Sequence, residues 1–430
     1  MKRNLLLLLA VFCGLHVMSE DFVAETTEGV PLWFSVLNED AKTCIVKKYY
    51  NSDIEGVVTI PSEAEGYRVT AIAYRAFYNC SNVTEFVLPE TIDSIGNQAF
   101  AGCRSIERLI VPLGVRSMRV SQTISNCSSL KILQIPVALV SKNWSYVSSM
   151  VNDFGNLSSI ADLYLDAPTM RDWYSKGVSC YYGMGGSYVM PKMHMLINGT
   201  EVTEVVIPEE ATNIAPGAFH GLSEITKVVI PSSVTNIGAM AFRCCSSLSD
   251  LQLPNTVTRL PDGVFSRTAI NELIVPEGVD TLDQYVADQC PNLTHVSLPS
   301  TLKAMGMKLF DGSLSLAKVT SYISTPFVAR APYDWDSTTS YIEDSFSGIQ
   351  NNVTLYVPKD AKTKYEALPS WASHFSDIVE FDINGIEAIG NGNIKKSENE
   401  GIFDLSGRRI NKSQLKRGIY IANGKKILIK

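Results

Sequence analysis

The feature that most constrains the fold is a proline that closes a β-rich run once every 22 to 24 residues. Intervals of 22 or 23 residues separate Pro208, Pro231, Pro254, Pro276 and Pro299, and similar intervals separate Pro89, Pro112 and Pro136. A unit of this length cannot bury its own apolar face, whereas stacked copies share one continuous core. We therefore predict a repeat solenoid, mainly β with short helical or 3-10 turns, built from units of about 23 residues.

Each unit repeats the same internal pattern. Eleven residues after the proline stands a phenylalanine, and further on comes an L-x-x-L-x-L frame such as Leu248, Leu251 and Leu253. Alternate side chains of a strand share a face, so Leu251 and Leu253 should point into the core and Gln252 towards solvent. The phenylalanines expected in the core are Phe100, Phe219, Phe242, Phe265 and Phe310.

Cysteines recur three residues after the phenylalanine position: Cys80, Cys103, Cys127, Cys245 and Cys290. Repetition at one position of successive units favours a packing role for a small, semi-apolar side chain, and we predict a ladder of reduced thiols. An occasional disulfide between neighbouring units and a metal site are the alternatives. Cys244, next to the ladder position, should face the other way.

The stretch "VTNIGAMAFRCCSSLSDLQLP" resembles the BspA-like class of bacterial leucine-rich repeats. The resemblance implies leucine-rich repeats at 54–136 and 201–322, separated by an irregular repeat or insert at 137–200. Residues 323–385 resemble the terminal repeat and cap of that class. We interpret residues 20–53 as an N-terminal β cap, because the ends of a solenoid need covers.

The C-terminal stretch "GIFDLSGRRINKSQLKRGIYIANGKKILIK", residues 401–430, is similar to the sorting segments (Por type) of the type IX secretion system of Bacteroidetes. Alternating apolar residues and the turn-forming Asn423-Gly424 pair predict a small β module here. A simple β cap or accessory module is the alternative interpretation. Residues 386–400, with their Gly-Asn repeat, are interpreted as a linker.

The N-terminus has the charged, apolar and small-residue order of a secretory signal peptide, which we place at residues 1–19. No other stretch approaches the roughly 20 apolar residues of a membrane span. The formal net charge is −7, which argues against a nucleic-acid partner because such binding rests on Lys and Arg. We expect an exported protein, at the outer-membrane surface or extracellular.

The sequence carries no recognisable catalytic motif. A nucleophile elbow, a phosphate-binding loop and a metal-binding His-Glu helix are all missing from it. We therefore predict a protein that is not an enzyme, with no cofactor and no metal site. A hydrolase with an unrecognised carboxylate pair remains as a third class, because Asp and Glu are plentiful.

What the repeat offers is surface. Strand positions between the buried ones should face solvent, and the candidate binding residues there are Ile110, Tyr164, Val206, Val229, Gln252 and Ile274, with Val87, Gln134 and Ser297 beside them. Exposed aliphatic side chains in a row indicate a contact surface. Alternatively, β-branched residues simply favour strands. Trp173 and Tyr182 of the insert form a second candidate site, unless they pack into a local core.

The prediction is a cell-surface protein that binds macromolecules through its extended strand face. The resemblance implies an adhesin-like role towards host matrix or serum proteins or other cells. The alternative is a carbohydrate-binding accessory protein that uses the aromatic insert. We expect protein or glycan ligands on host or neighbouring cells, and a monomeric state.

Overall fold

The computed structural model describes residues 21–47, 54–140, 159–175, 192–328 and 344–381, and the backbone of several strands between 387 and 429. The signal-peptide prediction, Tyr182 and most of the expected linker lie outside these residues. The chain divides into two compact units: Met1–Val205 with Pro216–Ile225, and Val206–Ala215 with Thr226–Lys430.

Unit 1 begins with an antiparallel meander. Strand β1 (Asp21–Glu25) pairs with β2 (Pro31–Asn38), and β2 pairs with β3 (Thr43–Val46). Strand β3 then pairs in parallel with β6 (Tyr67–Ile72), which is also bonded to β5 (Glu63–Ala64) and β8 (Ser94–Ile95). The meander therefore changes into the parallel pairing of the repeats.

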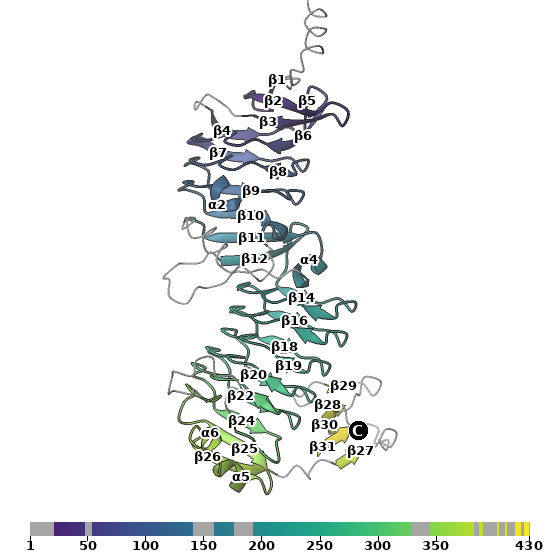
Figure 1. The fold of residues 1–430 in the computed structure, drawn as a ribbon, viewed down its shortest axis with the longest axis vertical. Helices are drawn as coiled ribbons and strands as arrows, with labels where there is room; N and C mark the ends of the chain where they lie inside the picture. Colours follow the sequence, from purple (N-terminus) through teal and green to yellow (C-terminus); the bar gives the residue numbers. More distant parts are fainter. Residues whose placement is uncertain are drawn as a thin grey trace, which may run out of the picture. The chain divides into compact units, whose positions relative to one another are not determined.

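The main sheet of unit 1 stacks one strand per repeat (Figure 1). Its parallel members, in order, are β4 (Glu55–Thr59), β7 (Asn82–Val87), β9 (Arg108–Ile110), β10 (Ile132–Pro136), β11 (Asp162–Ala167) and β12 (Lys192–Ile197). Strand β13 (Thr200–Glu201) adds an antiparallel hairpin to β12. Three short helices lie between strands: α2 (Val120–Thr123), η1 (Val137–Leu139) and α4 (Met170–Tyr174).

Unit 2 repeats this parallel arrangement in two sheets. One contains β14 (Glu204–Val206), β16 (Lys227–Val229) and β18 (Asp250–Gln252). The other contains β20 (Glu272–Ile274), β22 (His295–Leu298), β24 (Lys318–Ser321), β25 (Thr354–Pro358) and β26 (Asp377–Phe381). Two-residue strands pair on another side of the repeats: β15 (Asn213–Ile214), β17 (Asn236–Ile237), β19 (Arg259–Leu260), β21 (Thr281–Leu282) and β23 (Ala304–Met305).

Two helices, α5 (Lys362–Glu366) and α6 (Pro369–Ala372), connect β25 to β26. This is the strand-plus-helix order expected for the terminal repeat. The C-terminal strands form a five-stranded sheet of β27 (Glu387–Ile389), β31 (Lys425–Ile429), β30 (Gly418–Ala422), β28 (Ile402–Phe403) and β29 (Arg409–Ile410). Strand β27 belongs to this sheet, and its residues fall within the stretch interpreted as a linker.

Stacked phenylalanines form the core at the turn that precedes each strand. All five predicted phenylalanines are fully buried, and Phe77 and Phe346 join them. Their backbones are bonded from one repeat to the next, since the Phe77 N–H donates to the Ala99 carbonyl and the Phe242 N–H to that of Val264. Gly96 permits this approach, because a Cβ there would lie 2.4 Å from the backbone nitrogen of Tyr74.

The cysteine ladder is a packing feature, as its repetition predicted. Its five members are buried and in the thiol form, and Cys244 beside it is only half-buried. The structure adds a reason for the residue type: the thiols of Cys103, Cys127 and Cys290 donate to the phenylalanine carbonyl of the preceding repeat, at 3.1 to 3.2 Å. Ser313 stands at the same position and donates to the equivalent carbonyl of Ala287. The position therefore suits a small donor, although Leu222 and Ile349 occupy it in two other repeats.

The turn around each phenylalanine takes left-handed backbone conformations on both sides. Two residues after the phenylalanine position, φ is 62° at Asn79, 77° at Gly102 and 61° at Cys244. Asn and Gly adopt this region at little cost, whereas other side chains strain against it. Cys244 occupies a turn position of this kind, and its neighbour Cys245 occupies the ladder.

Two parts of the predicted core differ in the structure. Strand β12 extends the sheet of unit 1 where the sequence "PKMHM" departs from the repeat pattern, so the stretch interpreted as an insert contributes both β11 and β12 to that sheet. Leu251 and Leu253, predicted to be core residues, are half-buried. Strand β18, which contains Leu251 and ends just before Leu253, is bonded to β16 and ends its sheet, so one side of it has no strand partner within that sheet.

Candidate binding surfaces

The candidate residues lie side by side on outward positions of the parallel strands. In unit 1, Gln134 pairs with Ile110 on one side and with Tyr164 on the other. In unit 2, Val229 pairs with Gln252, and Ile274 pairs with Ser297. We call these two sets the outward row of unit 1 (Val87, Ile110, Gln134, Tyr164 and His194) and the outward row of unit 2 (Val206, Val229, Gln252, Ile274 and Ser297).

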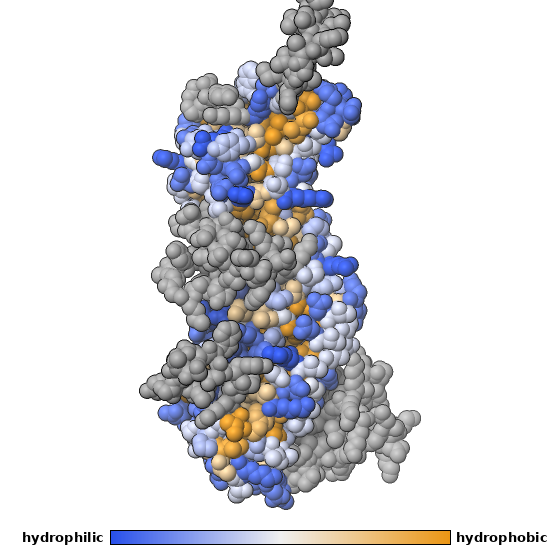
Figure 2. Space-filling model, viewed as in Figure 1, coloured by the Kyte–Doolittle hydropathy of each residue, from blue (hydrophilic) through white to orange (hydrophobic). Residues whose placement is uncertain are grey.

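Aliphatic side chains are exposed in both rows. Exposed fractions are 41% for Val87 and 37% for Ile110 in unit 1, and 60% for Val206 and 42% for Val229 in unit 2. Gln252 is exposed, and Gln134, Tyr164 and Ile274 are half-buried. Ser297 was expected to be exposed but is buried, so it adds nothing to the surface. Figure 2 shows apolar surface interspersed with hydrophilic side chains on the face that it presents.

Charged residues line the next outward position of most of these strands, with Ile132 on β10 and Thr354 on β25 as exceptions. In unit 2, Lys227 forms an ion pair with Asp250 at 3.0 Å, and His295 contacts Glu272 through Nδ1 and Thr320 through Nε2. In unit 1 the corresponding positions include Glu85 and Arg108, which pair in register and are exposed. Each apolar row is therefore flanked by charges of both signs.

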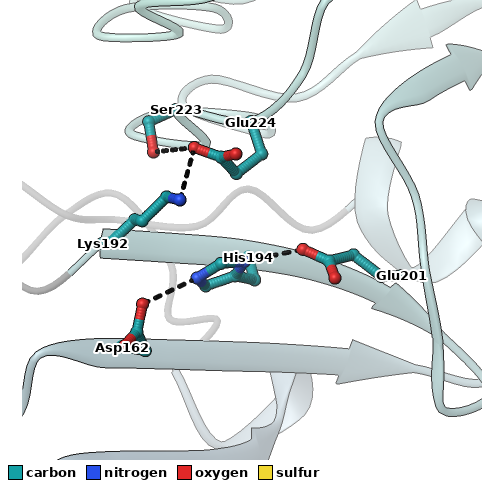
Figure 3. Close-up of polar contacts among 6 residues, drawn as sticks. All are labelled: Asp162, Lys192, His194, Glu201, Ser223 and Glu224. Atoms are coloured by element: carbon teal, nitrogen blue, oxygen red, sulfur yellow. Dashed lines mark hydrogen bonds and ion pairs between the residues drawn. The ribbon is translucent and has the colours of Figure 1, made fainter.

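A buried histidine ends the outward row of unit 1 (Figure 3). The ring of His194 stacks on that of Tyr164, with centroids 4.2 Å apart and 12° between the planes. Its Nε2 lies 3.0 Å from Asp162 Oδ1 and its Nδ1 lies 2.7 Å from Glu201 Oε1. These two contacts hold the ring of His194 in place. His194 thus fixes the orientation of Tyr164.

The same view shows a second ion pair, between Lys192 and Glu224 at 3.1 Å, with the Ser223 hydroxyl donating to that carboxylate at 3.3 Å (Figure 3). Sequence reasoning missed this cluster, because its residues stand in no known motif. Only the register between β11 and β12 brings Asp162 next to His194.

Trp173 does not face solvent. It is fully buried on helix α4, where its indole N–H donates to the Leu196 carbonyl at 3.0 Å and its ring stacks on Phe219. A buried ring has no free face for a sugar, and this environment matches the local-core interpretation of that residue. Tyr182, the other aromatic candidate, lies outside the described residues.

The thiols are poor candidates for chemistry. Burial raises the pKa of Cys80, Cys127 and Cys290 to about 11 and also raises that of Cys103. A thiol held protonated is neither a nucleophile nor a metal ligand. Across the described ranges, no three His, Cys, Asp or Glu side chains group in a way that could hold a metal ion. No helix in the described part of the chain has the length and apolar character to cross a bilayer.

One parallel strand recurs in each repeat, its inward apolar side chains are buried, and stacked phenylalanines fill the turn before it. These features define a leucine-rich repeat protein. The family model of the BspA type leucine rich repeat region matches the chain in six copies, over residues 47–161 and 195–317. The match covers more than half of the chain, and the protein belongs to this family.

Several solved structures are similar to the chain. A leucine-rich repeat protein from Bacteroides ovatus is 19% identical over 84% of this chain and 83% of its own, with a TM-score of 0.39. The pneumococcal vaccine antigen PcpA is 14% identical over 84% of this chain and 99% of its own, with a TM-score of 0.41. A leucine rich cell surface protein from Faecalibacterium prausnitzii is 16% identical over 70% and 94%, with a TM-score of 0.31. No curated protein sequence matches the chain.

Proposed function

We propose that this protein is an exported, cell-surface repeat protein that binds other macromolecules through its outward rows. The observation that carries the proposal is the row of exposed aliphatic side chains on neighbouring strands, above all Val206 and Val229. Exposed apolar residues that are contiguous, and not scattered singly, are typical of interaction sites. Parallel strands lie about 4.8 Å apart, so successive row residues present their side chains at a fixed spacing.

Protein ligands fit this surface best. Its apolar positions are flanked by ion-paired charges such as Lys227 and Asp250, which resembles the apolar centre and polar rim of protein interfaces. The ligands we propose are matrix or serum proteins of a host, or proteins of neighbouring cells, and the protein acts as a monomeric solenoid. Binding alone, without a catalytic step or a cofactor, accounts for the described features.

A binding screen with paired variants tests this function. The mature chain would be compared with Val87→Lys/Ile110→Lys, which changes the row of unit 1, and with Val206→Glu/Val229→Glu, which changes that of unit 2. Leu314→Lys is the matched control, because Leu314 is 66% exposed and lies outside both rows. We expect matrix-protein binding to fall at least about tenfold in one row variant, since charges at an apolar contact are costly. Equal binding by all four proteins would contradict the proposal.

We further propose that residues 1–19 direct export and that residues 401–430 act as a type IX sorting segment in a Bacteroidetes-type cell. The basic C-terminal sequence, with eight Lys or Arg and the single Asp404, supports a module separate from the acidic repeats. Deleting residues 401–430 in the producing bacterium should leave the repeats folded but retained in the periplasm. Normal surface display of the truncated protein would refute the sorting role.

A further inference from the structure

Two exposed tyrosines and a half-buried arginine lie together on the turn that follows β6, outside both outward rows. The Arg75 guanidinium carbon is 5.0 Å from the ring centroid of Tyr74 and 4.8 Å from that of Tyr78. Tyr74 is 57% exposed and Tyr78 37% exposed. We call Tyr74, Arg75, Tyr78 and Gln98 the Tyr–Arg platform.

The platform is held in place by the repeat next to it. Arg75 donates from Nε to the Gln98 side-chain oxygen at 2.5 Å, and the Tyr74 hydroxyl donates to the same oxygen at 3.3 Å. The backbone beneath is bonded from Phe77 to Ala99 and from Asn79 to Ala101. A binding group that is already ordered loses little conformational entropy when a ligand arrives.

The guanidinium retains unused binding capacity. Among the described residues, no carboxylate forms an ion pair with Arg75, and its bond to Gln98 uses only Nε. The two Nη groups of an arginine can donate to both oxygens of a carboxylate in a bidentate hydrogen bond. The rings of Tyr74 and Tyr78 beside the cation also fix the plane of the Arg75 guanidinium group.

The surroundings favour a sugar over a protein as the carrier of that carboxylate. The Gln98 amide contacts the platform, and the same two turns also contain Asn79 and Asn97; amide groups can both donate to and accept from hydroxyl groups. Exposed tyrosine rings offer apolar faces for C–H groups. A protein partner would need about 800 Å² of contact on this side, whereas the platform consists of four side chains.

We propose that the Tyr–Arg platform binds an acidic carbohydrate, with Arg75 holding a sugar carboxylate and Tyr74 and Tyr78 packing against the sugar ring. This site is independent of the outward rows. It would allow the protein to hold an acidic glycan and a protein ligand on different surfaces.

Titration calorimetry with a galacturonic acid tetramer and its methyl ester tests the site on the full mature chain. The ester keeps the sugar rings and removes the charge. Arg75→Gln is the main variant, and Gln98 shows that the equivalent turn position of the next repeat, with φ of 58°, accommodates glutamine. Lys308→Gln is the matched control, since Lys308 occupies the same turn position in unit 2 with φ of 50°. Tyr78→Ala tests the aromatic contact without changing charge.

We expect the acid to bind and the ester to bind at least about tenfold more weakly, because a charge-assisted bond to arginine is lost. Arg75→Gln and Tyr78→Ala should weaken binding of the acid, and Lys308→Gln should not. Equal binding of acid and ester, no binding of either, or an unchanged affinity in Arg75→Gln would each overturn the proposal. Tighter binding of a glutamate-rich peptide than of the tetramer would also overturn it, in favour of a protein ligand.

Discussion

Replacing Phe100 by alanine should strongly destabilise unit 1. Phe100 is fully buried, and its ring lies 5.8 Å from that of Phe77 and 4.8 Å from that of Phe86. Truncating a buried phenylalanine typically costs about 3 to 5 kcal/mol, through lost transfer free energy and the cavity that remains. Measured losses of this kind already include the lost ring contacts, which contribute about 0.5 to 1.5 kcal/mol for each aromatic pair. Because Phe100 takes part in two such pairs, we expect a loss at the upper end of the range, near 5 kcal/mol in the free energy of unfolding.

Urea unfolding followed by far-ultraviolet circular dichroism measures this loss. Repeat proteins can unfold in more than one step, so the comparison should use the transition that the substitution shifts. Phe100→Leu is the matched control, because it keeps most of the buried volume and should cost less than about 1.5 kcal/mol. A loss below about 1 kcal/mol for Phe100→Ala would refute the assignment of this ring to the core column.

Three further predictions follow from the turns and the ladder. Burial raises the pKa of Cys80, Cys127 and Cys290 to about 11, so these thiols should react slowly with a thiol reagent in the native protein near pH 8 and quickly in the denatured protein. Prompt labelling of these residues in the native state would contradict this prediction. Cys244 has a φ of 61°, so Cys244→Gly should raise the free energy of unfolding by about 1 kcal/mol, and a lowered urea midpoint would disprove the strain. Hydrogen bonds from Thr59, then Thr27, lower the pKa of Glu28 from 4.5 to about 2, so its ionised form stabilises the fold above pH 4.5 and this contribution is lost as pH falls towards 2. The melting-temperature difference between the native protein and Glu28→Gln should therefore shrink on acidification, and a constant difference would count against those bonds.

The repeat geometry was predictable because it depends on spacing alone. A residue that recurs at the same place in successive units meets its own copies in the fold, so the positions of Phe100, Phe242 and Cys103 could be assigned without coordinates. The exposure of Val206 and Val229 followed from the alternation of side chains along a strand. What spacing could not give was the acceptor of each thiol, since that depends on the turn backbone of the preceding repeat.

Features that break the period were missed for the same reason. Strand β12 begins 30 residues after the start of β11, and methionines and His194 stand in it instead of β-branched residues. The L-x-x-L-x-L frame therefore did not predict this strand. Without β12 there was no basis for placing His194 beside Asp162. The Tyr–Arg platform also escaped notice, because its residues occupy turn positions that vary from one repeat to the next. A tyrosine at each side of an arginine in the turn segment was the available signal.

Repeat length and strand register are independent in this protein. In unit 2, Lys318 on β24 pairs with Thr354 on β25 across 36 residues of chain, and Thr354 pairs with Asp377 on β26 across 23. Loops can therefore lengthen or shorten during evolution while the strands beside them keep their alignment. Connections of very different length are thus compatible with one continuous strand surface.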